Sequence, residues 1–586
     1  MLKDLNFPEA LKKSVYKEKK DELQAQLVML QQRCKRESLP VVIIVEGWGS
    51  AGKGSRISDL VVDLDPRLFN VYTTEDPIGY ENRLPFMARF WSRIGEHGSF
   101  TIFDQAWYDA AARGLMNARD KKAALSSGEL EDFDALGKLF ATDEHARSVS
   151  SEQGQEQNLS LEDYIASISS IERQLSQDGY LIVKLFLHIS QATQRQRFVD
   201  LMLDPQSSWR VDKEDLRQVQ RYPEYFKIFD ELIAQTNYSF APWHLVPAHE
   251  KRNASVQILQ ILVDSISEAL DHRARLKLEQ AKHSADKNQR ISEAHEKLNA
   301  YLAASADKSK ELEPKKLLDL QQAYTKARIG STEKLTSSFK LKKVKSLNEI
   351  RFDKTVASDE QYKQELKKEQ KRLSELQSIL YKLRVPVIIA YEGWDAAGKG
   401  GNIKRVARAL DARSYVVHPI AAPSAVELAH PFLWRFWTKI PRTGHIAIFD
   451  RTWYGRVMVE RIERFAREDE WMRAYDEINE FEAELERWGA VLIKFWINVS
   501  SDEQLRRFQE RQNDPAKQWK ITDEDWRNRE KNDLYHVCVN DMLRLTSSQY
   551  APWHIIESDD KRYARIKALR IINEELEAKL KDLGYK

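Results

Sequence analysis

The sequence predicts an α/β protein made of two tandem copies of one domain, each with a parallel sheet flanked by helices. Three observations support this class: an internal repeat, strand-length apolar segments that alternate with polar helical segments, and a glycine-rich turn after the first apolar segment of each copy. Strands that are apolar throughout are typical of parallel sheets with both faces covered. A chain of 586 residues is also longer than one hydrophobic core usually serves.

The repeat appears as two fixed offsets along the chain. Residues 40–48, PVVIIVEGW, recur at 386–394 as PVIIAYEGW, an offset of 346 residues. Further along, the APWH segment at 241–244 recurs at 551–554, an offset of 310 residues. The first copy therefore carries 36 extra residues, which we expect as a surface insertion within roughly 115–163. Two matched blocks in fixed order indicate a duplicated domain.

Alternating patterns locate the expected elements of the second copy. We expect strands at 385–391, 446–449 and 491–499, and a helix at about 400–410 that follows the glycine-rich turn. A long polar helix is expected before the third strand. The stretch between the copies is rich in Lys, Glu and Gln, so we expect a helical connector there, looser near 329–345.

Composition limits the classes of function. The net charge is only +2, so any basic binding site must be local, and we expect no nucleic-acid partner. Two cysteines, Cys34 and Cys538, cannot form a disulfide framework or a thiol-rich metal site. The N-terminus is charged where a signal peptide is apolar, and the apolar runs are only strand-length. We therefore expect a cytoplasmic protein without a membrane partner.

The turn at 393–400 fits the phosphate-binding pattern G-x-x-x-x-G-K between a strand and a helix. The phosphate-binding residues predicted here are Gly393, Gly398, Lys399 and Gly400. Backbone N–H groups of the loop and the helix N-terminus would surround an anion, and Lys399 would reach a phosphoryl oxygen. The alternative is a glycine-rich turn with a surface lysine.

Two aspartates are the predicted metal ligands. Gly400 stands where a serine or threonine usually helps to hold Mg²⁺, so another residue must do so. Asp395 lies inside the loop, and Asp450 follows an apolar strand, as a Walker-B-type aspartate does. Carboxylates and phosphate oxygens are the ligands that Mg²⁺ prefers. The alternative for Asp395 is an ordinary turn former.

Basic residues follow the second and third strands of the second copy. The first group is Arg451, Arg456 and Arg461. The second lies in a helical segment where a phosphoryl-transfer enzyme places its lid, and consists of Arg506, Arg507, Arg511, Lys517 and Lys520. A solvated charged face is the alternative. We predict that the catalytic residues are Asp395, Lys399, Asp450, Arg451, Arg506 and Arg511, with Arg456 and Lys517 binding phosphate.

The first copy keeps the framework and loses the site charges. Lys53 and Asp104 match Lys399 and Asp450, but most other charged positions differ. The replaced positions are Asp395 by Gly49, Arg451 by Gln105, Arg456 by Ala110, Arg506 by Gln196, Arg511 by Leu201 and Lys517 by Ser207. Loss of these groups removes what phosphoryl transfer needs. The predicted domains are a degenerate, inactive copy at 1–272, a helical connector at 273–350 and a catalytic copy at 351–586.

At these residues the chain resembles the polyphosphate kinase 2 family. The strings that carry the resemblance are EGWDAAGKGG at 392–401, IFDRTWY at 448–454, KFW at 494–496 and APW at 551–553. The resemblance implies tandem P-loop kinase domains of the thymidylate-kinase type, each with a mobile lid. It also implies Mg²⁺-assisted phosphoryl transfer between inorganic polyphosphate and nucleotides.

Two-domain members of the family resemble enzymes that phosphorylate AMP to ADP with polyphosphate. Two alternatives remain: an ATP-dependent nucleoside monophosphate kinase, and a scaffold that binds polyphosphate or nucleotides without turnover. The fused pair also leaves room for a homo-oligomer.

Overall fold

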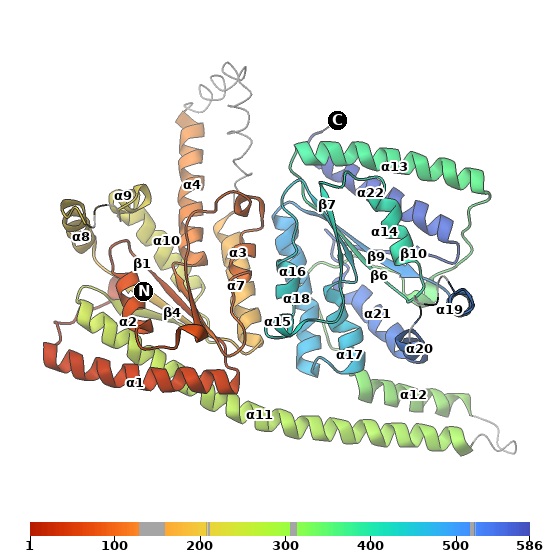
Figure 1. The fold of residues 1–586 in the computed structure, drawn as a ribbon, viewed down its shortest axis with the longest axis horizontal. Coiled ribbons are helices and arrows are strands. Elements are labelled where there is room, and N and C mark those ends of the chain that lie inside the picture. The colour runs from red at the N-terminus through yellow and green to blue at the C-terminus, as the bar shows by residue number, and fades with distance from the viewer. Residues whose placement is uncertain are drawn as a thin grey trace. The chain divides into compact units, whose positions relative to one another are not determined.

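The computed structural model describes residues 1–127, 159–206, 208, 211–304, 313–515, 518, 521 and 523–585. The chain forms two compact units, both drawn in Figure 1. Unit 1 comprises Met1–Leu278 and Pro423–Thr438, and unit 2 comprises Glu279–Ala422 and Lys439–Lys586. Much of the expected insertion and the predicted phosphate ligand Lys517 lie outside the described residues. Within those residues, every helix is too short or too polar to span a bilayer.

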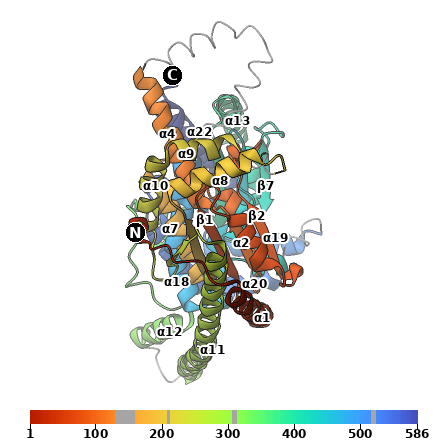
Figure 2. The same cartoon turned by 90° about the vertical axis from the view of Figure 1, so that its left-hand side faces the viewer.

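Unit 1 contains a five-stranded sheet and its helices. The strands are β1 (Val41–Gly47), β2 (Phe69–Thr73), β3 (Phe100–Asp104), β4 (Leu181–His188) and β5 (Trp243–Pro247). The helices are α1 (Lys13–Glu37), α2 (Lys53–Val61), α3 (Ala88–Trp91), α4 (Trp107–Ser127), α7 (Leu161–Gln177), α8 (Gln191–Leu203), α9 (Lys213–Gln220), α10 (Tyr222–Gln235) and the first half of α11 (Lys251–Ala304), whose residues from Glu279 on belong to unit 2. Helices α8, α9 and α10 lie close together, as Figure 2 shows from another side.

Unit 2 repeats this plan. Its strands are β6 (Val387–Gly393), β7 (Tyr415–Pro419), β8 (Ile446–Asp450), β9 (Val491–Asn498) and β10 (Trp553–Glu557). The helices that follow α11 in the chain are α12 (Pro314–Ile329), α13 (Asp359–Lys382), α14 (Lys399–Ala407), α15 (Ala425–Leu428), α16 (Trp434–Trp437), α17 (Val459–Glu463), α18 (Glu468–Arg487), α19 (Ser501–Asn513), α20 (Asp523–Glu530), α21 (Asn532–Thr546) and α22 (Lys561–Asp582). The short helices α15 and α16 fall in the segment that belongs to unit 1.

The two sheets have the same strand order. The order is β2-β3-β1-β4-β5 in unit 1 and β7-β8-β6-β9-β10 in unit 2, and every neighbouring pair is parallel. The predicted parallel α/β sheet in each copy is therefore confirmed. The sequence located the three central strands but missed β7 and β10, which are the edge strands of unit 2.

The core of unit 2 explains why most residues of its central strands are apolar. One face of the sheet packs against α13, α14 and α22, with Leu376, Val406 and Leu569 among the buried side chains. Helices α18 and α21 pack together, and α18 also contacts β9. Burial from both sides favours apolar side chains in the central strands.

One buried polar network interrupts each core at the same place. In unit 2, Lys494 Nζ donates to Glu482 Oε2 at 2.7 Å, to Tyr454 Oη at 2.9 Å and to the Thr546 carbonyl at 2.6 Å. In unit 1, Lys184 makes the same three contacts, with Glu172, Tyr108 and Thr236. Both lysine–glutamate pairs are fully buried. Each buried charge is paired and hydrogen-bonded, as burial requires.

The stretch predicted as a connector is helical at first. Helix α11 begins well before residue 273, and α12 follows it. The chain then runs without a long helix to α13, held by contacts with unit 2 such as the Leu341–Ser548 bridge. This irregular part coincides with the looser segment that the sequence indicates. The proposed domain boundaries stay a prediction.

Candidate phosphate and metal site

The glycine-rich loop joins β6 to α14, and two glycines give it its shape. Gly393 has φ +150°, and a Cβ there would stand 2.3 Å from the Ile497 carbonyl oxygen of β9. Gly398 caps α14 with φ +110°. Both positions require glycine because L side chains rarely adopt these angles. The loop therefore directs its backbone N–H groups and the start of α14 toward one point.

Five of the six predicted catalytic residues meet at this point. A cavity of about 620 Å³ is lined by Asp395, Lys399, Asp450, Arg451 and Arg511. Gly398 and Gly400 also line it, so the loop forms one wall. The Lys399 ammonium donates to the carbonyls of Gly393 and Trp394 within the loop. Cationic and anionic groups thus converge on one hollow at the carboxyl ends of β6 and β8.

Contacts from the two helices after β9 fix Asp395. Asn528 of α20 donates from Nδ2 to Asp395 Oδ2 at 2.9 Å, and Gln504 of α19 donates to the Asp395 carbonyl at 3.0 Å. Arg451 lies 3.7 Å from Asp395 Oδ1. Asn528 and Arg451 therefore orient the carboxylate, and Gln504 holds the backbone of the same residue.

Glu392 holds the turn that carries Asp450 and Arg451. Its Oε1 accepts from the backbone N–H of Thr452 at 2.7 Å and from the Thr452 hydroxyl at 2.8 Å. Arg451 has φ +66°, an unusual conformation for a residue with a side chain. Burial raises the pKa of Glu392 to about 7, although the positive charge of Lys399 opposes the rise.

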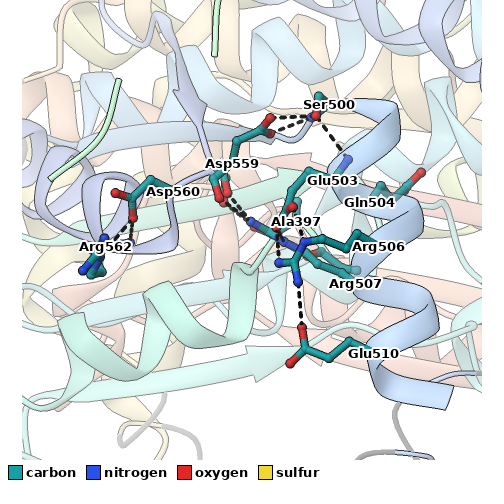
Figure 3. A network of polar contacts seen from close by, with 12 residues as sticks. Ala397, Ser500, Glu503, Gln504, Arg506, Arg507, Glu510, Asp559, Asp560 and Arg562 are labelled. Carbon is teal, nitrogen blue, oxygen red and sulfur yellow. Dashed lines mark hydrogen bonds and ion pairs between the residues drawn. The ribbon is translucent and has the colours of Figure 1, made fainter. Parts of the chain in front are cut away.

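Arg507 supports the loop from behind instead of facing the cavity. Its guanidinium donates to the carbonyls of Ala396 at 2.9 Å and Ala397 at 3.0 Å, and it also reaches the carbonyls of Ser558 and Asp559. Figure 3 shows this arginine between the loop and the segment after β10. In the first copy, Arg197 makes equivalent contacts with Ser50 and Ala51. This arginine therefore belongs to the shared framework.

Three predicted residues that the structure describes, Gly393, Arg456 and Arg506, do not line the cavity. Arg506 is 60% exposed and pairs with Glu503 at 2.6 Å and Glu510 at 3.5 Å, as Figure 3 also shows. Arg456 lies 3.2 Å from Glu460, four residues further along the chain. Lys517 is outside the described residues. For Arg506, helical phase decides the result, because neighbouring residues of one helix face different directions.

The donor set fits a hard divalent cation. Asp395 and Asp450 contribute two carboxylates to one cavity. Among the described residues, no group of three or more His, Cys, Asp or Glu side chains is placed to hold a metal. Mg²⁺ is commonly held by one or two carboxylates together with substrate phosphates and water. The two aspartates therefore suit Mg²⁺ bound along with a phosphorylated substrate.

The equivalent space of the first copy is filled by protein. A Cβ on Gly49 would stand 2.6 Å from Asp215 Oδ1 and 2.9 Å from Phe198 Cζ. Gln218 Oε1 accepts from the Gly49 N–H at 2.7 Å. The loop and Lys53 otherwise keep the geometry of the second copy, since Lys53 Nζ lies 3.1 Å from the Gly47 and Trp48 carbonyls. The backbone of the loop is thus kept, while the place of the Asp395 side chain is taken by Asp215 and Phe198.

Sequence reasoning missed Glu392, Asn528 and Asp525, the last of which lines the cavity. Glu392 could not be recognised as a site residue from the sequence, because it stands at the end of a buried strand. Asn528 and Asp525 belong to a polar helical segment that has no motif. The repeat contains the one available signal: Gln218 and Asp215 occupy the matching positions of the first copy, where they close the space.

Sheet order, loop and cavity together define a P-loop α/β protein of the kinase type, present in two copies. The chain matches the family described as Polyphosphate kinase 2 over residues 10–136, 148–274 and 356–584. It belongs to the polyphosphate kinase 2 family.

Relatives match the whole chain. It is 33% identical to a polyphosphate:AMP phosphotransferase of Pseudomonas aeruginosa, with 99% of each chain covered. It is 34% identical to a protein of the same name from Pseudomonas syringae pv. tomato, over 95% of this chain and 93% of the other. A solved structure described as a polyphosphate kinase 2 from Pseudomonas aeruginosa has a TM-score of 0.71 and 30% identity, covering 99% of this chain and 100% of that one.

Proposed function

We propose that this protein transfers a phosphoryl group from inorganic polyphosphate to AMP, forming ADP, in the cavity of its second copy. The observation that carries the proposal is the convergence of Asp395, Lys399, Asp450, Arg451 and Arg511 on one cavity. The names of the full-length relatives favour AMP as acceptor and polyphosphate as donor.

The reaction needs little proton transfer from the protein. A phosphate oxygen of AMP attacks the terminal phosphorus of polyphosphate. A P–O bond forms as the anhydride bond to the next phosphate breaks, and that phosphate leaves with the electron pair. Because a phosphate monoester is largely dianionic near neutral pH, the acceptor oxygen is already unprotonated. The products are ADP and polyphosphate shortened by one unit.

The side chains then act by position and charge. Lys399, Arg451 and Arg511 border the cavity and would neutralise charge on the transferred group, a role in which one arginine can contribute roughly 10³–10⁵ in rate. Asn528 and Gln504 keep Asp395 in place. We propose that Asp395 and Asp450 hold Mg²⁺, which would supply further neutralisation of phosphate charge.

Product analysis with AMP, long-chain polyphosphate and Mg²⁺ tests the proposal. We expect ADP, and we expect no ADP when ATP replaces polyphosphate at equal phosphate concentration. Turnover with ATP alone would establish the nucleoside monophosphate kinase instead. Absence of turnover with either donor would favour a scaffold that only binds its ligands.

The metal assignment has its own matched pair of variants. Asp395→Asn and Asp450→Asn should abolish transfer while leaving the melting temperature within a few degrees. Asp104→Asn changes the aspartate that corresponds to Asp450 in the first copy and should leave turnover intact. Normal rates with unchanged Mg²⁺ dependence in Asp395→Asn or Asp450→Asn would refute the assignment. A cytoplasmic location and homo-oligomer formation remain predictions, the latter measurable by light scattering.

A further inference from the structure

Unit 1 has a cavity of its own, away from its glycine-rich loop. The walls come from α3, α4, α7 and the segment after β2, and no residue of the loop at 47–54 lines the cavity. Helices α4 and α7 pack together, as Figure 1 shows. The volume of about 350 Å³ lies in the range usual for sites that bind small molecules.

One cation of the wall is available to a ligand. Arg89 of α3 has no carboxylate within ion-pair distance among the residues that the structure describes. It donates one hydrogen bond, from Nη1 to the Glu75 carbonyl at 2.9 Å. Burial lowers the pKa of this guanidinium, and the charge of Glu81 opposes the shift. The other N–H groups of Arg89 can therefore donate to an anion in the cavity.

Tyr164 of α7 supplies a second donor. It is 5% exposed and lines the cavity, and its hydroxyl forms no hydrogen bond with any residue that the structure describes. Gly114 of α4 leaves room for this hydroxyl, because a Cβ there would clash with Oη. Burial raises the pKa of Tyr164 to about 12, so the hydroxyl keeps its proton near neutral pH. A buried hydroxyl without a partner is costly, and a ligand that accepts its hydrogen bond removes that cost.

Neighbouring ion pairs occupy the other charged groups close to Arg89. Arg113 of α4 pairs with Asp109 at 2.5 Å and with Asp76 at 3.1 Å. Glu81 pairs with Arg93 at 3.2 Å. The carboxylates nearest to Arg89 are thus bound to other arginines.

An aromatic wall and an acidic edge limit the kind of ligand. Phe86 lines the cavity, and its ring centroid lies 5.0 Å from that of Tyr164, with the two planes at 78°. A planar ring of a ligand can stack on such a side chain. Glu75 and Asp76 also line the cavity and are exposed, so a ligand that is anionic along its whole length would be repelled. The cavity therefore suits a compact ligand with one anionic group and a planar ring.

The second copy arranges the matching residues differently. Arg435 matches Arg89 but pairs with Glu427 at 3.2 Å, whereas the matching Glu81 of the first copy pairs with a different arginine. The wall also differs, because α4 is one continuous helix, while the matching residues 453–473 are divided among a short 3-10 helix, α17 and the start of α18. The available arginine beside an unbroken helix is thus a feature of the first copy.

We propose that this cavity of the first copy binds a nucleoside monophosphate without phosphorylating it. The phosphate accepts hydrogen bonds from Arg89 and Tyr164, and the base stacks against Phe86. Transfer does not follow, because the first copy has glycine at the position of Asp395. Such a site goes beyond the proposed function, since no bond is made or broken there.

Equilibrium dialysis with AMP alone counts the nucleotide sites on the full-length protein. We expect two AMP per chain for the unchanged protein and one for the double variant Arg89→Gln, Tyr164→Phe, which keeps side chains of similar size. Arg119→Gln changes an exposed residue of α4 that does not line the cavity, and as the control it should bind two AMP.

A second variant reaches the same site by filling it. Ala118→Phe adds a ring at a position of α4 that lines the cavity and should also remove one AMP. Thermal melting shows which variants are folded, and Ala118→Phe decides the matter if the double variant does not fold. Folded cavity variants that bind as many AMP as the unchanged protein would overturn the proposal.

Adenosine and ribose 5-phosphate test the class of ligand, because each lacks one of the two recognised parts. Each should compete at least about tenfold more weakly than AMP for the site that the cavity variants lose, a difference of about 1.4 kcal/mol. Affinity equal to that of AMP for either compound would overturn the assignment to a nucleotide.

Turnover separates this site from the proposed function. The cavity variants should keep kcat for ADP formation within about twofold, and a parallel loss of kcat would overturn a role without catalysis. If the second copy bound no AMP, the unchanged protein would bind one AMP and the cavity variants none. That result would refute the proposed function and still support the site in the first copy.

Discussion

Arg507 and Arg511 occupy one helix, yet the structure gives them opposite surroundings. Arg507 is buried, with a side chain 2% exposed, and its guanidinium donates hydrogen bonds to backbone carbonyls of the loop. Arg511 lines the cavity. Truncation of Arg507 should therefore lower mainly the stability of the protein, whereas truncation of Arg511 should lower mainly its activity.

Arg507→Ala should lower the free energy of unfolding by about 2–4 kcal/mol, because it leaves buried carbonyls without donors. Arg511→Ala should lower kcat strongly and shift the melting temperature little. Thermal unfolding and steady-state rates on both variants separate the two roles. Equal losses of stability and activity in Arg511→Ala would assign that residue to packing.

Glu392 makes part of the stability depend on pH. Its pKa is about 7 in the folded protein, against an ordinary value of 4.5. A carboxyl whose pKa is raised by folding stabilises the protein fully below pH 4.5 and loses that contribution as the pH rises through about 7. At 1.36 kcal/mol per pH unit, the loss is on the order of 3 kcal/mol.

Glu392→Gln removes this titration while keeping an oxygen that can accept from Thr452. The unfolding free energy of the unchanged protein, minus that of the variant, should fall as the pH rises from 4.5 to about 7. Urea unfolding of unit 2 across this range measures the difference. A difference that stays constant with pH would contradict the prediction.

At the scale of elements, α8 and α9 of the first copy close the space that α19 and α20 leave open in the second. Phe198 and Asp215 stand against Gly49. Gly49→Ala should therefore destabilise unit 1 by about 1–3 kcal/mol, since the new methyl group meets these side chains. Gly54→Ala is the matched control, because its nearest neighbour would be 3.8 Å away.

Gly54 lies in α2, where alanine should stabilise the helix by about 0.5–1 kcal/mol. Differential scanning calorimetry compares the two variants in one experiment. Equal melting temperatures for Gly49→Ala and Gly54→Ala would mean that α8 and α9 move to make room for the methyl group at position 49. An aspartate could then be restored at that position.

The sequence predicts the central strands of both sheets because they contain continuous apolar runs, as in residues 41–45 and 387–391. It misses β7, whose side chains are exposed or half-buried because the strand lies at an edge. The loop, Lys399 and the two aspartates follow from motifs. The inward turn of Arg507 and the contact of Asn528 with Asp395 do not, because they depend on helical phase and on segments far apart in the chain.

At the scale of the whole molecule, the copies should contribute unequally to turnover. Lys399→Ala should reduce ADP formation by about 10³-fold, because that lysine borders the cavity. Lys53→Ala changes the matching lysine of the first copy and should leave turnover nearly unchanged. Steady-state rates of the two full-length variants decide the matter. A comparable loss in Lys53→Ala would show that the first copy takes part in the chemistry.

The buried networks of Lys184 with Glu172 and of Lys494 with Glu482 lie at matching places in sheets of identical strand order. Strands of one copy therefore resemble strands of the other closely enough to pair wrongly during synthesis. Strand β5 ends at Pro247 and β6 begins at Val387, about 140 residues later, which a ribosome needs roughly 7–28 s to add. Small α/β domains fold in milliseconds to seconds. A first sheet that forms on this time scale is complete before its competitor emerges, so we expect the order of translation to protect the tandem repeat from exchanging strands.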